Sequence, residues 1–243
     1  MLVRSRVKYI QTLGQKKFRE EEGLFVAEGP KLVAELLAPG MAEIEEVFAV
    51  KEWMDQNKRS LGKTKVTEVL ESELERISEL STPNKVLALV KQFDKQPVIE
   101  TKGKITVVLD GVQDPGNLGT IIRIADWFGV EQIICSHDSA DMYNSKVVQS
   151  TMGSIARVKI VYTDLTAWLG QQKNIRIYAA ALNGDDVTTI KKIKEGIFVF
   201  GNESKGISPE IMQLANTKIT IAKKGNAESL NVAVAAGIIL SHL

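Results

Sequence analysis

Near the C-terminus, a polar loop gives way to an unbroken apolar run in the stretch ESLNVAVAAG, residues 228–237. Ser and Asn are residue types that cap the N-terminus of a helix, and Ser229 and Asn231 precede the apolar run here. The run, Val232 to Leu240, predicts a helix that packs closely against another surface. Such a helix start offers free backbone N–H groups to an electron-rich ligand. Taken alone, the stretch is more typical of an ordinary capped helix, so its meaning depends on the segments upstream.

The composition indicates an ordinary globular protein of one large or two small domains. Of the 243 residues, 44% are hydrophobic and 25% are charged, as in most soluble proteins. No apolar run reaches the roughly 18 residues that a transmembrane helix needs, and the N-terminus lacks the apolar core of a signal peptide. The single cysteine, Cys135, excludes an internal disulfide and a Cys-rich zinc site. We therefore expect a cytoplasmic protein with no membrane partner and no metal, in which Cys135 fills a buried strand.

The net charge of +1 hides an uneven distribution. Residues 1–19 contain six basic residues and no acidic one: Arg4, Arg6, Lys8, Lys16, Lys17 and Arg19. A basic stretch of this kind can contact phosphates, with Lys16, Lys17 and Arg19 as the expected cluster. A solvated helix face is an equally good interpretation. Because the chain has only His137 and His242, we expect neither a histidine-based metal site nor a Ser-His-Asp triad.

Alternating strands and helices predict a small α/β domain over residues 1–92. Helices are expected at residues 5–20, 30–38, 53–59 and 72–79. Strands are expected at residues 23–29, 45–51, 65–69 and 86–90. The polar segment that follows contains Pro97 and predicts an interdomain linker over residues 93–103.

Residues 104–243 predict a second, larger α/β domain with a mostly parallel sheet. Its first strand, residues 105–109, is nearly all apolar, as expected where both faces of a sheet are covered. Further strands are expected at residues 132–135, 158–161, 175–180, 196–200 and 218–221. Helices are expected at residues 119–127, 145–154, 165–171, 209–215 and 230–243. Ligands of such sheets bind beyond the carboxyl ends of the strands, where this chain has polar, glycine-rich segments.

The first of these segments follows the strand at residues 105–109. Glycines and a proline predict a tight loop there, followed by a helix that places Arg123 on the same face as Gly119 and near Asn117. Arg123 is the only charge in residues 118–125, so it is either paired or functional. The structural alternative is a pair with Asp126 or Glu203. No G-x-G-x-x-G pattern is present, which argues against a dinucleotide site.

The second segment, residues 200–210, follows a later strand. Gly201 and Gly206 permit a tight loop whose backbone can approach a ligand, and Glu203 supplies a carboxylate there. As an isolated pattern this segment is weak, because a helix-capping turn has the same composition.

Together the three segments resemble the SpoU/TrmH family of RNA ribose 2′-O-methyltransferases, a branch of the SPOUT superfamily. The resemblance covers nearly the whole chain. Its three motifs are Asn117-x-Gly119-x-x-x-Arg123, Gly201-Asn202-Glu203-x-x-Gly206 and Ser229-Leu230-Asn231-Val232. Residues 144–148 and 150–154 also fit a block that the family has between the first two motifs. The first domain resembles the family's RNA-substrate-binding domain.

The resemblance implies a fold, a cofactor and an oligomeric state. The fold is a small N-terminal α/β RNA-binding domain followed by a SPOUT-type α/β domain with a C-terminal trefoil knot. The knot would bind S-adenosylmethionine, and the family works as a homodimer packed through the knot region. The implied cofactor-binding residues are Leu182, Gly201, Asn202, Gly206, Ile221 and Leu230.

The resemblance also implies catalytic roles. Arg123 would activate the ribose 2′-hydroxyl. An arginine is a poor base, because its pKa exceeds about 12, so we prefer an electrostatic role in which it stabilises a developing alkoxide. Asn117 would orient the substrate or Arg123, and Glu203 would hold Arg123 or position the ribose. Ser229 and Asn231 would line the mouth of the knot. No metal is needed, because a sulfonium leaving group is already activated.

One departure from the family is the sequence Ile221-Ala222-Lys223, where the family often has Ile-Pro-Met. This departure bears on the affinity for the cofactor more than on the resemblance to the family. The expected substrate is structured RNA, with rRNA favoured over tRNA because of the added N-terminal domain. A catalytically silent RNA-binding knot protein is the alternative, and the retained motif residues argue against it. A nucleotide-dependent oxidoreductase is not expected without a phosphate-binding glycine fingerprint.

Overall fold

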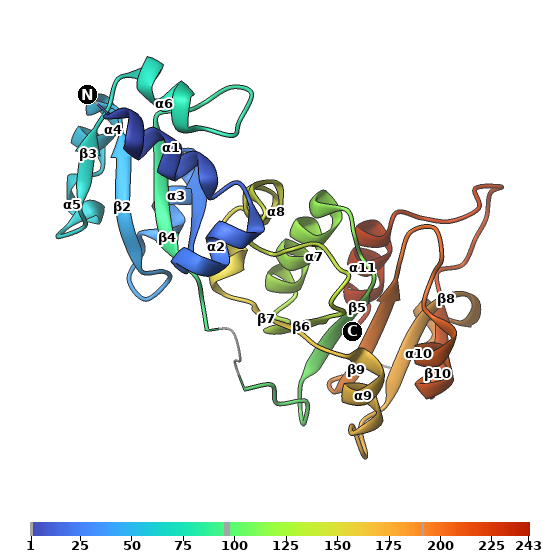
Figure 1. Cartoon of the computed structure of the whole chain (residues 1–243). Coiled ribbons are helices and arrows are strands. Elements are labelled where there is room, and N and C mark those ends of the chain that lie inside the picture. Colours follow the sequence, from blue (N-terminus) through green and yellow to red (C-terminus); the bar gives the residue numbers. More distant parts are fainter. Residues whose placement is uncertain (1, 95–97, 191) are drawn as a thin grey trace. The chain divides into compact units, whose positions relative to one another are not determined.

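A computed structural model describes residues 2–94, 98–190 and 192–243, and its contacts divide the chain into two compact units (Figure 1). The first unit consists of residues 1–95 together with residues 141–157. The second unit consists of residues 96–140 and 158–243. Contacts thus group the segment 141–157 with the N-terminal part of the chain. The linear boundaries at residues 92 and 104 stay a prediction.

The first unit is built on a four-stranded sheet with strand order β1-β4-β2-β3. The strands are β1 (Leu24–Glu28), β2 (Ile44–Ala49), β3 (Val66–Glu68) and β4 (Val86–Lys91). β4 runs antiparallel to both β1 and β2, whereas β3 is parallel to β2. Large apolar side chains from both sides of the sheet are fully buried, among them Phe25, Phe48, Leu87 and Leu89. This sheet confirms the predicted α/β character of the N-terminal part.

Six helices of the N-terminal part surround this sheet: α1 (Arg4–Thr12), α2 (Lys16–Glu22), α3 (Pro30–Leu36), α4 (Lys51–Gln56), α5 (Lys58–Leu61) and α6 (Glu71–Ile77). The single helix expected over residues 5–20 is wrong, because the chain turns at Leu13–Gln15. The helix expected over residues 53–59 is likewise two helices, and the strand before it ends at Ala49 because Lys51 already begins α4.

The segment 141–157 packs onto the first unit through α8 (Ser145–Thr151), which contacts β1. The expected helix 145–154 stops early, because Met152 and Gly153 have positive φ angles of 51° and 98°. Gly153 also allows a close approach, since a Cβ there would lie 2.9 Å from Cβ of Glu35. Glu35 in turn pairs with Arg157 at 3.1 Å.

Arg19 holds the segment 141–157 in place and is 3% exposed. Its Nη1 donates to the carbonyl oxygens of Leu13 and Gly14, each at 2.8 Å, and its Nη2 lies 2.6 Å from Oδ2 of Asp141. Among the described residues, its Nε is a buried side-chain donor without a partner. The expectation that Arg19 belongs to an exposed basic cluster is therefore wrong, because its guanidinium is buried and hydrogen-bonded within the first unit.

The second unit is built on a six-stranded sheet in which all neighbouring strands are parallel. The strands are β5 (Ile105–Asp110), β6 (Gln132–Cys135), β7 (Lys159–Tyr162), β8 (Ile177–Asp186), β9 (Gly196–Gly201) and β10 (Thr217–Thr220). Their spatial order is β10-β8-β9-β5-β6-β7. The parallel sheet expected from the sequence is confirmed. Cys135 is fully buried, and burial raises the pKa of its thiol.

Four helices cover this sheet: α7 (Pro115–Trp127), α9 (Leu165–Gly170), α10 (Pro209–Leu214) and α11 (Val232–Leu240). α9 and α10 share one apolar cluster with the sheet, and α7 and α11 lie side by side (Figure 1). α7 begins four residues before the expected start at Gly119, because Oδ1 of Asp114 accepts the N–H of Asn117 and Pro115 suits the first helical position. α11 begins at Val232 and ends at Leu240, shorter than the expected helix 230–243.

The strand order creates a switch point beside β5. From β5 the chain proceeds through β6 and β7 on one side, and β9, β8 and β10 lie on the other side. Open parallel sheets bind ligands outside the carboxyl ends of the strands at such a point. Asp110, at the end of β5, pairs with Gly201, at the end of β9. The fold therefore brings the first two motifs to one place. Within the described ranges, no helix is long and apolar enough to cross a membrane.

Candidate active site

Asn117 joins the three motifs at the carboxyl edge of the second sheet. Its Nδ2 donates to Oε1 of Glu203 at 2.6 Å, and its Oδ1 accepts from Nδ2 of Asn231 at 2.9 Å. Both partners are exposed, so this network faces the surface beyond the strand ends. The structure thus brings together three of the five residues expected to be catalytic. Their individual roles stay predictions.

Asn231 also caps α11, as the sequence predicted. Its Oδ1 accepts from the backbone N–H groups of Ala233 and Val234 at 2.9 and 3.2 Å. One amide side chain therefore fixes the helix start with its oxygen and the first motif with its nitrogen. Ser229, the other expected cap, is exposed and makes no hydrogen bond to any residue that the structure describes.

The second motif forms a closed turn between Asn202 and Gly206. The backbone N–H of Asn202 donates to the carbonyl of Gly206 at 3.0 Å, and the reverse bond is 2.9 Å long. The Asn202 side chain accepts from two N–H groups inside the turn and donates to the carbonyl of Gly111 at 2.8 Å. Gly201 cannot carry a side chain, because a Cβ would collide with the backbone of Gly206. The turn is therefore locked to the end of β5.

A further loop, residues 136–140, meets the end of β5 from the other side. The N–H of Gly111 donates to Oγ of Ser136 at 2.8 Å, and the N–H of Ala140 donates to the carbonyl of Val112 at 2.9 Å. Sequence reasoning missed this loop. The signal was available, because the polar run Ser136-His137-Asp138-Ser139 follows a buried strand that neighbours β5.

Arg123 is exposed on α7, between the first motif's Asn117 and the helix C-terminus. The structure shows no hydrogen bond or ion pair from its guanidinium to any described residue. Glu203, the proposed structural partner, bonds to Asn117 instead. The guanidinium is thus available to a ligand.

Five of the six residues expected to bind the cofactor lie on, or just after, the neighbouring strands β8, β9 and β10. Oγ1 of Thr220 donates to the carbonyl of Leu182 at 3.2 Å, which places Ile221, the next residue, beside β8. β8 lies between β10 and β9, and β9 ends at Gly201. Leu182 and Leu230 are 77% and 48% exposed. Exposed apolar side chains beside a glycine turn that a ligand can approach closely suit a nucleoside, so the residues present fit S-adenosylmethionine. Leu230 lies in an exposed stretch, and no contact joins it to the others.

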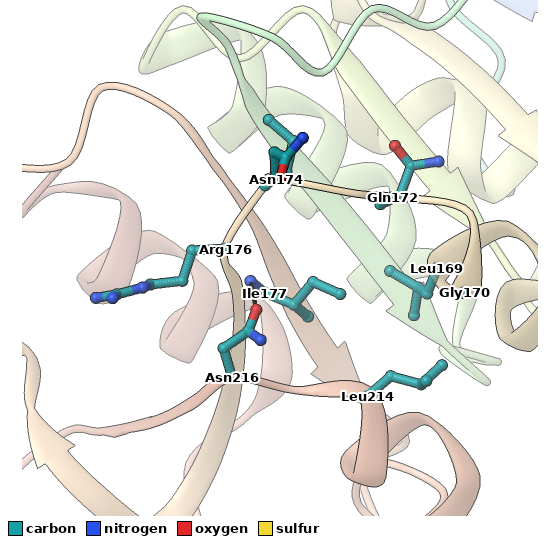
Figure 2. A pocket seen from close by; sticks show the side chains of 9 residues that line it. Leu169, Gly170, Gln172, Asn174, Arg176, Ile177, Leu214 and Asn216 are labelled. Atoms are coloured by element: carbon teal, nitrogen blue, oxygen red, sulfur yellow. Dashed lines mark hydrogen bonds between the residues drawn. The ribbon is translucent and has the colours of Figure 1, made fainter.

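A separate hollow of about 500 Å³ lies at the opposite, amino edge of the same sheet (Figure 2). Leu169, Ile177 and Leu214 contribute apolar side chains to it, whereas Arg176 extends away from them. Asn216 exchanges two hydrogen bonds with the backbone of Ile177, at 2.8 and 2.9 Å, so its amide belongs to the scaffold. None of the motif residues lines this hollow, and the candidate active site is at the other edge.

Comparisons with known proteins match both parts of the chain. Residues 104–241 match the SpoU rRNA Methylase family, and residues 4–88 match the MRM3-like substrate binding domain. A similar protein from Bacillus subtilis is the 23S rRNA (guanosine(2553)-2′-O)-methyltransferase RlmP. It is 31% identical over 98% of this chain and 95% of its own length.

Solved structures with the same fold extend over the full chain. An AdoMet-bound rRNA methyltransferase from Sinorhizobium meliloti has a TM-score of 0.86 at 33% identity, covering 100% of this chain and 95% of that one. The SpoU methyltransferase AviRb from Streptomyces viridochromogenes, in complex with AdoMet, has a TM-score of 0.84 at 25% identity, covering 99% and 97%. These matches agree with the α/β fold expected from the resemblance. The chain belongs to the SpoU rRNA methylase family.

Proposed function

We propose that this protein transfers a methyl group from S-adenosylmethionine to a ribose 2′-hydroxyl of rRNA. The observation that carries the proposal is the hydrogen-bonded network of Asn117, Glu203 and Asn231 at the switch point. It joins three segments that lie far apart in the sequence, with Arg123 exposed on the same helix as Asn117. Relatives named as rRNA 2′-O-methyltransferases, and similar structures with bound AdoMet, support the reaction and the methyl donor.

S-adenosylmethionine, when bound, supplies a methyl group on a positively charged sulfur. Leu182 and Leu230 would cover its apolar parts, and the backbone around Gly201, Asn202, Gly206 and Ile221 would hold its polar edges. Lys223 and Lys224 follow Ile221 on the same exposed segment. Both side chains are exposed, so their charges can stay in solvent when the donor binds.

Arg123 would act on the nucleophile. A ribose hydroxyl attacks only as its proton leaves, and the guanidinium stays protonated throughout. Its contribution is to stabilise the negative charge that develops on the 2′-oxygen. This stabilisation is strongest where no competing partner holds the arginine. Asn117 would orient the ribose or Arg123. Glu203, held by Asn117, would fix the second motif against the first.

The first unit would bind the RNA. Exposed basic residues lie on α1 and α2: Arg4, Lys8, Lys16 and Lys17. Lys16 and Lys17 make only exposed pairs with glutamates one turn later, at 3.8 and 3.9 Å, and such pairs are weak. A phosphate can replace them. Neutralising Lys16 and Lys17 should weaken RNA binding and reduce the slope of log K against log salt by about 0.7 per lost contact. Unchanged binding would assign these lysines to a solvated face.

We also propose a homodimer that packs through the predicted knot region, in the cytoplasm. Trp127 is 83% exposed at the end of α7, and Val234 is 50% exposed on α11, which contacts α7. Large apolar side chains on adjacent helices are typical of a covered surface. Light scattering should give twice the chain mass for the wild type and a smaller value for Trp127→Glu. A monomeric wild type would contradict this part of the proposal.

The decisive experiment is the transfer of labelled methyl groups to RNA from a strain that lacks the gene. We expect label in rRNA at one ribose, located by its resistance to alkaline cleavage. Label in tRNA alone would favour the tRNA alternative. Tight RNA binding without transfer to any RNA would favour the catalytically silent alternative.

A further inference from the structure

Lys205 is an exposed cation in the turn that carries the second motif. Its ammonium group makes no hydrogen bond or ion pair with any residue that the structure describes. Glu203, two residues earlier, is the nearest acidic residue in the sequence, but its carboxylate accepts a hydrogen bond from the Asn117 side chain. The charge of Lys205 is therefore available to a ligand.

The backbone that carries Lys205 is fixed at both ends of the turn. Within the turn, Oδ1 of Asn202 accepts the N–H of Lys205 at 3.1 Å. After the turn, Ile207 packs into the core of the second unit, and the N–H of Ser208 donates to Oδ2 of Asp110 at 2.7 Å. The Cα of the lysine is thus held near the end of β5, whereas its flexible side chain can adjust to a ligand.

The same turn is bonded to the first motif and to the end of β5. Glu203 accepts from Asn117 at 2.6 Å, and the Asn202 side chain donates to the carbonyl of Gly111 at 2.8 Å. Because Lys205 follows Glu203 by two residues in this closed turn, it lies beside the network that joins the motifs. A cation at this place meets the part of a substrate that borders the reacting group.

The chemistry of an ammonium group narrows the choice of ligand. It is a compact positive charge with three donors, which suits an anionic oxygen. Two anions can come to this edge: an RNA phosphate and the carboxylate of S-adenosylmethionine. Phosphates flank every ribose of an RNA chain, and phosphate contacts set the register of a nucleic acid on a protein. The phosphate is favoured, because Lys205 is exposed to solvent, whereas the methyl donor is expected against the backbone at the base of the turn.

We propose that Lys205 binds a backbone phosphate next to the target ribose and so positions the 2′-hydroxyl, an inference that rests on the proposed function. The contact is a charge-assisted hydrogen bond from the ammonium group to a phosphate oxygen. Lys205 is a positioning residue and takes no part in the bond changes of methyl transfer. Because the contact is present before and during transfer, it contributes to RNA binding more than to the maximal rate.

RNA binding without the methyl donor tests this contact. Lys205→Met should weaken binding about 10-fold, the effect of losing one hydrogen bond to a charged group, and should reduce the slope of log K against log salt by about 0.7 to 0.9. Lys205→Arg keeps the charge and should bind nearly as well as wild type. Lys173→Met is the matched control, because this exposed lysine precedes β8 at the amino edge and its loss changes the net charge equally. A wild-type slope in Lys205→Met, or equal losses in both Met variants, would overturn the proposal.

An RNA with one neutral phosphate locates the contact. A methylphosphonate replaces the phosphate on either side of the target ribose, in RNAs with a 2′-deoxy target, which prevents self-cleavage. On one of the two sides, the replacement should weaken binding to wild type and should not weaken binding to Lys205→Met any further. Losses that add on both sides would show that the lysine and these phosphates act independently, and would overturn the proposal.

Donor binding and transfer rates distinguish the other anion. Calorimetry should give the same affinity of Lys205→Met and wild type for S-adenosylmethionine; weaker binding to the variant would assign the lysine to the donor carboxylate and overturn the proposal. In single-turnover transfer, Lys205→Met should need more RNA for the half-maximal rate and should keep a maximal rate near wild type. A lower maximal rate with an unchanged RNA requirement would also overturn it. If the wild type transfers no methyl group to any RNA, the proposed function itself fails, whereas the salt slope needs no transfer and tests Lys205 separately.

Discussion

The two units use charged residues in opposite ways. In the first unit, Arg19 and Glu46 are each 3% exposed and are surrounded by hydrogen-bond partners. In the second unit, Arg123 on α7 and Asp138 in the loop after β6 are exposed and have no partner among the described residues. Burying an unpaired charge is very unfavourable, so interior charges must be matched within the fold. An exposed charge at strand ends has no such requirement and stays available for a ligand.

Glu46 shows the first pattern most fully. Oε1 accepts from Thr67 at 2.7 Å, and Oε2 accepts from Lys65 at 3.1 Å and from Arg6. The Arg6 guanidinium also lies 5.6 Å from the centre of the Phe48 ring. These contacts tie α1 to β2 and β3. Their role is to stabilise the fold.

The largest expected effect comes from breaking a buried pair of the first unit. Asp141→Ala leaves the Arg19 cation buried without its carboxylate and should destabilise the protein by about 3–5 kcal/mol. Urea unfolding measures this change. Glu20→Ala, which removes an exposed pair with Lys16 at 3.8 Å, is the control and should change stability by less than about 0.5 kcal/mol. Equal effects of the two variants would contradict the contrast between buried and exposed charges.

Arg123→Ala should produce the reverse result. Methyl transfer should fall by about 100- to 1,000-fold, as when one electrostatic stabiliser is removed, while binding of the methyl donor persists. The melting temperature should stay unchanged, because the side chain has no partner in the described structure. Arg59→Ala, at an exposed arginine of the first unit, should leave transfer intact. Full activity of Arg123→Ala would contradict the assigned role.

Asn231 sharpens the comparison, because it serves both stability and the site. Asn231→Ala should lower stability by about 1 kcal/mol through loss of the cap and should also lower activity. Asn231→Asp keeps the capping oxygen but cannot donate to Asn117. It should retain stability while transfer falls. If Asn231→Asp were fully active, the bond between Asn231 and Asn117 would have no catalytic value.

The smallest effects concern two buried carboxylates of the first unit. Burial raises the pKa of Glu28, and hydrogen bonds from Ser78 and Glu79 lower it only in part. Burial also raises the pKa of Glu46, but the bonds from Thr67, Lys65 and Arg6 outweigh burial, so its pKa lies below the usual value.

The two shifts predict opposite dependences of stability on pH. The stabilising contribution of Glu28 is present below its unfolded-state pKa and is lost as the pH rises through its raised folded-state pKa. That of Glu46 is present above its unfolded-state pKa and is lost as the pH falls through its lowered folded-state pKa. Unfolding free energies of Glu28→Gln and Glu46→Gln between pH 4 and 7 should therefore diverge from wild type in opposite directions. If the stabilities of the two variants diverged from wild type in the same direction, the opposite pKa shifts of Glu28 and Glu46 would be contradicted.

The sequence was sufficient where local pattern and chemistry agree. The apolar strand at residues 105–109 predicted a parallel sheet, and the residue types before the last apolar run predicted the cap at Asn231. The set of residues that meet at the edge of the sheet came from the resemblance of the three motifs to the SpoU/TrmH family. The strand order was not predictable from spacing, because sequence neighbours such as β7 and β8 lie at opposite parts of the sheet. The knot implied by the resemblance stays a prediction for the same reason.

The burial of Arg19 was not predictable from the local sequence, because it depends on Asp141, more than 100 residues away in the chain. The early start of α7 was a local signal that the sequence contained, namely Asp114 before Pro115. The loop at residues 136–140 was overlooked because a single polar run has no distinctive spacing.

The grouping of residues 141–157 with the N-terminal part has a consequence for protein engineering and for evolution by recombination. The chain passes between the units three times, so the first folding unit is not one continuous stretch of the gene. A graft of residues 1–92 onto a relative would leave Arg19 facing a foreign loop in place of Asp141. Exchange of the first unit between relatives therefore requires two segments to move together, and a single recombination point near the linker would produce mismatched halves.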